Sequence, residues 1–109
     1  MATTYKVLGQ SNPAATTATT LYTVPASTSA VVSTIVICNQ AAAAATYRIS
    51  IRPAGGAQTA AMYVAYDVAI AANDSTALTL GITLATTDVI TVYGSTATLS
   101  FVAFGSEIA

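Results

Sequence analysis

Short groups of apolar and β-branched residues follow one another along this chain, separated by Gly, Pro, Asn, Asp and Ser. Groups of this kind at short, regular spacing are typical of antiparallel sandwiches and barrels. The pattern predicts an all-β fold, namely an antiparallel β-sandwich of jelly-roll or immunoglobulin-like type with about eight strands. We expect residues 1–109 to form a single domain, because the chain is long enough for one hydrophobic core but not for two.

Turn-forming residues place the predicted strands. Gly9 is expected to end the first strand and Pro25 the second, and Gly94 with Ser95 is expected to form a hairpin between the last two. The alanine run at 41–45 is too short to nucleate a helix, so we predict a loop there. The predicted strands are 4–8, 21–24, 31–39, 46–52, 62–68, 78–80 continued by 82–84 beyond Gly81, 89–93 and 96–104.

Alternation along these segments assigns their faces. It is cleanest in 46–52, where Tyr47, Ile49 and Ile51 share one side. Alternation in 62–68 puts Tyr63 and Tyr66 on opposite faces. Segment 31–39 is apolar on both sides, so we expect a central strand whose second face meets the other sheet or a neighbouring subunit. The predicted core consists of Val7, Leu21, Val24, Ile35, Ile37, Tyr47, Ile49, Ile51, Val64, Leu78, Leu80, Val89, Leu99 and Phe101.

Charged residues are rare in this sequence. It has three Lys and Arg, four Asp and Glu, no His, and a formal net charge of -1. They make up 6% of the chain, against about 25% in an ordinary soluble domain. A surface with so little charge repels its neighbours weakly, and depletion of charge marks the centres of protein interfaces. We therefore expect the protein to be covered by copies of itself or by a larger assembly.

The single cysteine and the apolar runs limit where the protein is made. Cys38 cannot form an internal disulfide, which fits synthesis in a reducing cytoplasm. The longest apolar run, 60–66, is far shorter than the roughly 20 residues of a membrane-spanning helix. The first residues show no basic segment followed by an apolar run. We expect no membrane partner and no secretory signal.

A search for catalytic and metal-binding chemistry yields no candidate. Nucleophilic catalysis needs a base beside the nucleophile, and the chain has no histidine. We interpret Cys38 as a small buried hydrophobe. Asp67, Asp74 and Asp88 do not form a calcium loop, and the last two are better explained as turn residues that bond the local backbone. We predict a protein that is not an enzyme and has no cofactor and no metal.

Arg48 and Arg52 are the candidate partner-contact residues. With Lys6 they are the only basic residues, which is too few for nucleic acid to be the main partner. Both lie on the polar side of 46–52. One interpretation is a solvated face, or pairing with Glu107 or Asp67 of the same chain. The other is a salt bridge to another subunit, because a guanidinium binds a carboxylate through two hydrogen bonds.

The tyrosines allow two interpretations as well. Tyr22, Tyr47, Tyr63, Tyr66 and Tyr93 would form a carbohydrate-stacking platform if several of them were exposed together. Tyrosines at sheet margins more commonly lie in a core or an interface with the hydroxyl in water, and we favour that interpretation.

Several short motifs carry a resemblance to a known class of proteins. They are LGQ at 8–10, NP at 12–13, TLYTVP at 20–25, VSTI at 32–35, CN at 38–39, RISIRPAG at 48–55 and GITL at 81–84. Together they resemble small virion structural proteins of tailed bacteriophages, especially phages of cyanobacteria and other aquatic hosts. The resemblance implies a β-sandwich module on a capsid, neck, tail or fibre. It brings no catalytic or metal-binding residue to this chain.

Two function classes remain, and a third is kept as an alternative for comparison. The first is a capsid decoration or cement protein that contacts the major capsid protein and copies of itself, with a trimer favoured by the three-fold positions of capsid lattices. The second is a neck, tail or fibre component, with host glycan as a contact. The third is a free carbohydrate-binding sandwich, which would not need so neutral a surface. The first two imply a virion location after assembly in the host cytoplasm.

Overall fold

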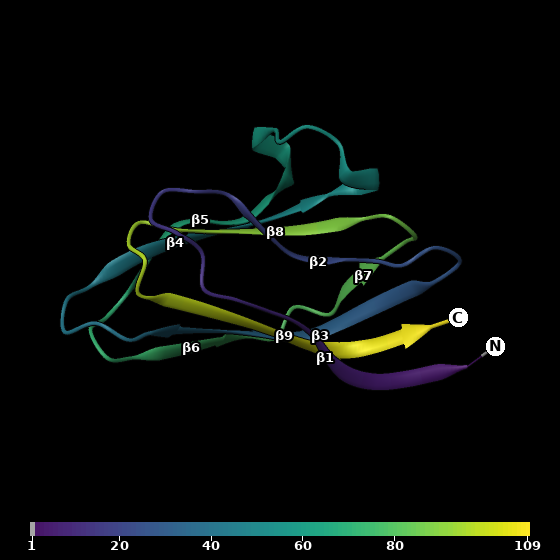
Figure 1. Ribbon diagram of the computed structural model, residues 1–109, viewed down its shortest axis with the longest axis horizontal. Coiled ribbons are helices and arrows are strands. Elements are labelled where there is room, and N and C mark those ends of the chain that lie inside the picture. The colour runs from purple at the N-terminus through teal and green to yellow at the C-terminus, as the bar shows by residue number, and fades with distance from the viewer. Residues whose placement is uncertain (1) are drawn as a thin grey trace.

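Nine strands form two sheets that pack face to face, which confirms the predicted antiparallel β-sandwich (Figure 1). The structure is a computed structural model that describes residues 2–109. Two short 3-10 turns, η1 (Pro53–Gly55) and η2 (Ala60–Met62), join β4 to β5. The strands are β1 (Thr3–Ser11), β2 (Thr19–Thr23), β3 (Ser29–Asn39), β4 (Ala45–Arg52), β5 (Tyr63–Ile70), β6 (Ser75–Leu78), β7 (Ile82–Leu84), β8 (Val89–Gly94) and β9 (Leu99–Ile108).

The strand order is that of a jelly roll. Sheet 1 has the order β1-β9-β3-β6, with β7 also paired to β3, and sheet 2 has the order β2-β8-β4-β5. The strand ladders are all antiparallel. Since β6 and β7 follow each other along β3, they act as one interrupted strand and give two four-stranded layers. This order decides between the two predicted types in favour of the jelly roll.

Gly9 and Gly94 act differently from the sequence-based predictions, whereas Gly81 separates two strand segments as predicted. β1 does not end at Gly9 but continues to Ser11, and Gly9 permits a close approach, since a Cβ there would collide with the Leu21 carbonyl of β2. Gly81, with φ +62, separates β6 from β7. The hairpin predicted at Gly94 is wrong, because β8 lies in sheet 2 and β9 in sheet 1, so the chain crosses between layers there.

The core fills the space between the two sheets. Tyr47 of β4 and Phe101 of β9 meet edge to face at its centre, with ring centroids 6.3 Å apart. The structure confirms burial of Leu21, Val24, Ile35, Ile37, Tyr47, Ile49, Val89, Leu99 and Phe101, whereas Ile51 and Leu78 are partly buried against the core. Residues that the prediction missed are also buried, among them Leu8, Val32, Ile70, Leu84, Ile90 and Val92.

Three predicted core residues are exposed, namely Val7, Val64 and Leu80. A register shift between Val7 and Gly9 turns Leu8 inward in place of Val7. In β5, Ala65 pairs with Ile49 and is buried, so Val64 points outward. Leu80 lies in the break between β6 and β7, so it belongs to neither strand and its side chain is not directed into the core by strand alternation.

The loop prediction at 41–45 is confirmed for 41–44, and Ala45 begins β4. No helical turn in residues 2–109 is long and apolar enough to cross a membrane.

Candidate functional site

The outward face of sheet 1 is uncharged. Since Leu99, Phe101 and Ala103 of β9 point into the core, the residues between them point outward, and the ladder places the outward residues of β1 and β3 beside them. Across the strands of sheet 1 in residues 2–109, the outward positions hold no Lys, Arg, Asp or Glu. We call this surface the neutral face, and its apolar members include Tyr5, Val7, Val31, Val36, Val102 and Phe104.

The neutral face is most exposed near the two chain ends. Tyr5 keeps 84% of its surface in solvent and Phe104 keeps 39%. Between them lies an open hollow of about 570 Å³, lined by Tyr5, Val31, Ser33, Phe104, Gly105, Ser106 and one charged residue, Lys6, which pairs with Glu107 at the edge of the face. Large apolar side chains gathered on one side of a sheet without charge are characteristic of a surface that another protein covers.

The two sheets are joined at the same end by a hydrogen-bonded group around Glu107. The Tyr22 hydroxyl of β2 donates to Glu107 Oε2 at 2.6 Å, and Lys6 Nζ lies 3.2 Å from Glu107 Oε1. The carboxylate is only 16% exposed. Bonding to Tyr22, followed by bonding to Lys6, lowers the pKa of Glu107, and burial together with this carboxylate raises the pKa of Tyr22.

Glu107→Gln is expected to make unfolding less sensitive to acid. A lowered pKa in the folded protein means that the carboxylate contributes stability above its unfolded value of 4.5, and this contribution is lost as the pH falls through the folded pKa. The variant should therefore be less stable than wild type at pH 7, and the difference should shrink below about pH 4. Urea unfolding across this range measures it. Asp74→Asn is the matched control, and an equal deficit for Glu107→Gln at pH 7 and pH 3 would contradict the assignment.

Arg48 is enclosed by contacts within its own chain. Its guanidinium lies 4.2 Å from the ring centre of Tyr66 and 4.3 Å from that of Tyr93. Asp67 accepts hydrogen bonds from Arg48 Nε at 2.6 Å and from Nη2 at 3.2 Å. This bonding raises the pKa of Arg48 and lowers the pKa of Asp67. Of the two alternatives for Arg48, the structure shows the pair with Asp67, while a contact to another subunit stays a prediction.

Arg52 holds the connection between β4 and β5. Its guanidinium donates to the carbonyls of Gly56 at 2.7 Å and Gly55 at 2.8 Å, and to the buried Thr91 hydroxyl at 3.3 Å. Asp88 accepts the Ala54 N–H at 2.9 Å. Arg52 therefore shapes the 53–62 loop, and its predicted contact with a partner remains a prediction.

The remaining polar candidates have local roles. Asp74 accepts the Ser75 N–H, and Asp88 accepts the Ala85 N–H, which confirms both as turn residues. Cys38 is only half-buried, on the outward side of β3, so the expected full burial is wrong. Among residues 2–109, no three His, Cys, Asp or Glu side chains gather closely enough to hold a metal ion.

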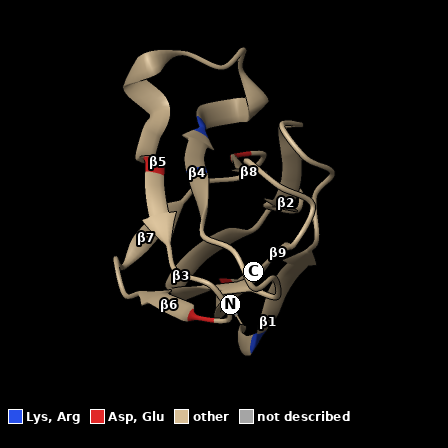
Figure 2. Ribbon diagram, turned by 90° about the vertical axis from the view of Figure 1, so that its left-hand side faces the viewer, with Lys and Arg blue, Asp and Glu red and all other residues tan. Residues whose placement is uncertain are grey.

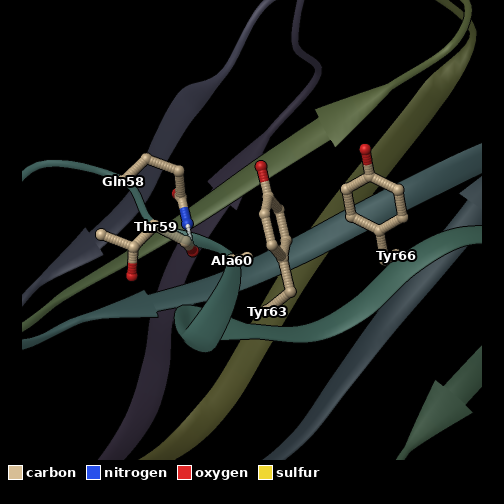
Figure 3. Close-up of a pocket in the computed structure, with 5 residues that line it drawn as sticks. All are labelled: Gln58, Thr59, Ala60, Tyr63 and Tyr66. Carbon is tan, nitrogen blue, oxygen red and sulfur yellow. Dashed lines mark hydrogen bonds between the residues drawn. The ribbon is translucent and has the colours of Figure 1, made fainter.

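The tyrosines differ in burial, and Tyr93 is half-buried beneath Arg48. Tyr22 and Tyr47 are buried, as we favoured. The prediction that Tyr63 and Tyr66 lie on opposite faces is wrong, since their ring centroids are only 4.8 Å apart. Both rings line an open hollow of about 580 Å³ together with Gln58, Thr59 and Ala60 (Figure 3). The ladder between β4 and β5 shifts between Tyr63 and Ala65, which pair with Ser50 and Ile49, and this extra residue turns Tyr63 to the face of Tyr66.

Comparisons of the chain with family models, with curated proteins and with solved structures find no match. Its function has therefore to be inferred from its surfaces.

Proposed function

We propose that this protein is a non-enzymatic structural component of a phage particle, a decoration or cement protein that bridges neighbouring capsid subunits. The neutral face of sheet 1 carries the proposal. It gathers exposed Tyr5, Val7 and Phe104 with no charged residue at the outward positions of its described strands. Such a face would be covered by the major capsid protein and by copies of this chain, for which a trimer matches the three-fold positions of a capsid lattice.

The distribution of charge supports the same assignment. Figure 2 shows the few charged residues as isolated coloured segments on ribbons that are otherwise tan. Of the seven charged side chains, Lys6 and Glu107 pair with each other, and Arg48 pairs with Asp67. A partner would therefore meet a surface whose main features are shape, hydroxyl groups and apolar area, and binding would depend little on salt.

The fold and the motifs agree with this role by analogy. Jelly rolls occur in viral capsid proteins and in lectins, although a fold alone does not determine function. The sequence motifs resemble those of small virion proteins of tailed phages. The mechanism is mass action. A protein that binds only the assembled shell stabilises it by about 4 kcal/mol per site when its free concentration is 1,000 times its Kd.

Phe104→Lys is expected to weaken attachment to the particle at least about a hundredfold, because an unpaired ammonium would have to be buried in the contact. The variant should fold, since Phe104 lies on the surface. The measurement adds purified protein to particles that lack it and quantifies the bound copies and the temperature of DNA release. Sedimentation of the free wild-type protein and of the variant measures the oligomeric state, which the proposal predicts to be a trimer for the wild type.

Val64→Lys is the matched control, since Val64 is exposed to a similar extent but lies on sheet 2. It should attach like wild type. Equal attachment of both variants, or particles whose heat stability does not change when the protein is removed, would rule out cementing by the neutral face. A handful of copies per particle would assign the protein to a neck, tail or fibre.

A further inference from the structure

The geometry points to a carbohydrate-binding site on sheet 2, in which the hollow between the 53–62 loop and β5 takes one pyranose ring of a neutral saccharide. The site lies on the sheet opposite to the neutral face and shares no residue with it. It goes beyond the proposed function, and each of the two proposals can fail without the other.

The aromatic wall of the hollow is held in place. Tyr66 keeps 56% of its surface exposed. The Arg48 guanidinium covers one face of this ring at 4.2 Å, and Tyr63 stands against it at an interplanar angle of 81°. Figure 3 shows the Tyr63 ring between Tyr66 and Gln58, with both hydroxyl groups pointing the same way. Rings that are already fixed lose little conformational entropy when a ligand stacks on them.

The polar wall is also set before a ligand arrives. Gln58 Oε1 accepts a hydrogen bond from the Ser50 hydroxyl at 2.6 Å, and Ser50 is buried at 2% exposure. Gln58 Nε2 donates to the Thr59 carbonyl at 3.0 Å. An amide has two donors and about two acceptor positions on its oxygen, so Gln58 keeps one N–H and one lone pair for a ligand.

The loop that carries Gln58 is anchored at its base. Arg52 binds the carbonyls of Gly55 and Gly56, and Asp88 binds the Ala54 N–H. These anchors use the charges of Arg52 and Asp88 to shape the loop. Because the side chains that make the contacts come from β4 and the turn before β8, the loop is fixed to the body of sheet 2.

The chemistry of the lining selects the ligand class. An aromatic face attracts the C–H groups on one side of a pyranose, because the face is electron-rich, and an amide bonds the hydroxyl groups at the rim of the sugar. The one guanidinium next to the rings, Arg48, is already paired with Asp67, which leaves no cation here for a phosphate or a carboxylate. A neutral saccharide fits this combination.

The test titrates the full-length protein with cellohexaose, mannohexaose and chitohexaose and follows ¹H–¹⁵N shifts. At least one hexasaccharide should bind with a Kd of about 0.1–1 mM, as expected for one open stacking site. The shifts should concentrate in 56–66 and at Tyr93. Tyrosine fluorescence gives a second readout, because the chain contains no Trp.

Variants separate a sugar site from a surface cluster. Tyr66→Ala and Gln58→Ala should each weaken binding at least about tenfold, and Tyr66→Phe should keep it. Tyr5→Ala is the matched control, since Tyr5 is more exposed and lies on sheet 1, and it should bind like wild type. No binding of any of the three saccharides to the wild type at about 10 mM, or equal binding by Tyr66→Ala, would overturn the proposal.

A second experiment, with bacterial cells, distinguishes two sources of the saccharide, namely cell-surface polysaccharide and soluble glycan. Intact bacterial cells with and without periodate oxidation of their surface sugars are incubated with the protein. Retention that periodate abolishes supports the site and assigns it to cell-surface polysaccharide. Binding of a hexasaccharide without retention on cells also supports the site and assigns it to soluble glycan.

Discussion

Phe101→Ala is expected to lower the free energy of unfolding by about 3–5 kcal/mol. The Phe101 side chain is fully buried in the middle of β9 and contacts Tyr47 of the opposite sheet at 6.3 Å between ring centres. Its removal takes away apolar contacts from both sheets and leaves a cavity that β-strands cannot close by small movements. This loss is a large part of the 5–15 kcal/mol that stabilises a small domain.

Urea unfolding followed by far-ultraviolet circular dichroism measures the effect. Phe104→Ala is the control, because Phe104 has the same chemistry three residues later but points outward on the neutral face. It should lose less than about 1 kcal/mol. Equal losses for the two variants would show that the assignment of faces in β9 is wrong.

Gly105→Ala is expected to lower the free energy of unfolding by about 3 kcal/mol, although it adds only one methyl group. A Cβ at Gly105 would lie well inside contact distance of the Val31 carbonyl oxygen and 3.0 Å from the Val32 Cα. Both atoms belong to the backbone of β3, next to the register shift between Val32 and Thr34. No side chain can rotate to make room, so the ladder between β3 and β9 has to distort.

Ser106→Ala is the neighbouring control. Ser106 points outward, so its replacement by Ala should change the free energy of unfolding by no more than about 0.5 kcal/mol. Thermal unfolding of the two variants beside wild type gives the comparison. A Gly105→Ala protein as stable as wild type would mean that β3 and β9 do not approach as closely as described.

Alternation predicted the faces of strands correctly where the ladder is regular. In β9, the residues Leu99 and Phe101 were assigned to the core by alternation alone, and both are fully buried. In β1 and β5 the same reasoning failed, because one extra residue in a strand reverses every later side chain. Such a bulge is set by the partner strand, so the local pattern that places Val7 and Val64 inside cannot reveal it.

Connections between strands were predicted less well than the strands. Gly94 and Ser95 carry the signal of a turn, and the chain bends and turns at 95–98, directly after β8 ends at Gly94. The sequence does not say which sheet the chain enters next, because that depends on the pairing of β9 with β1 and β3. The jelly-roll order follows from these long-range pairings, whereas the strand pattern fits more than one sandwich.

The candidate site was predicted in part. Arg48 and Arg52 stood out as rare charges, but their partners depend on the register of β4 and on the loop fold. Gln58 and Ser50 were missed, since a single amide in a polar loop carries no signal. Tyr63 and Tyr66 were placed on opposite faces, because alternation cannot reveal the register shift between Tyr63 and Ala65, where these residues pair with Ser50 and Ile49.

The most direct test of the proposed function is an electron cryo-microscopy reconstruction of purified particles that carry this protein. The proposal predicts jelly-roll density at many equivalent positions of the shell, with Tyr5, Val7 and Phe104 of the neutral face against neighbouring subunits. Sheet 2 and its 53–62 loop would face outward. Particles without this density, or with the neutral face open to solvent at every position, would contradict the account.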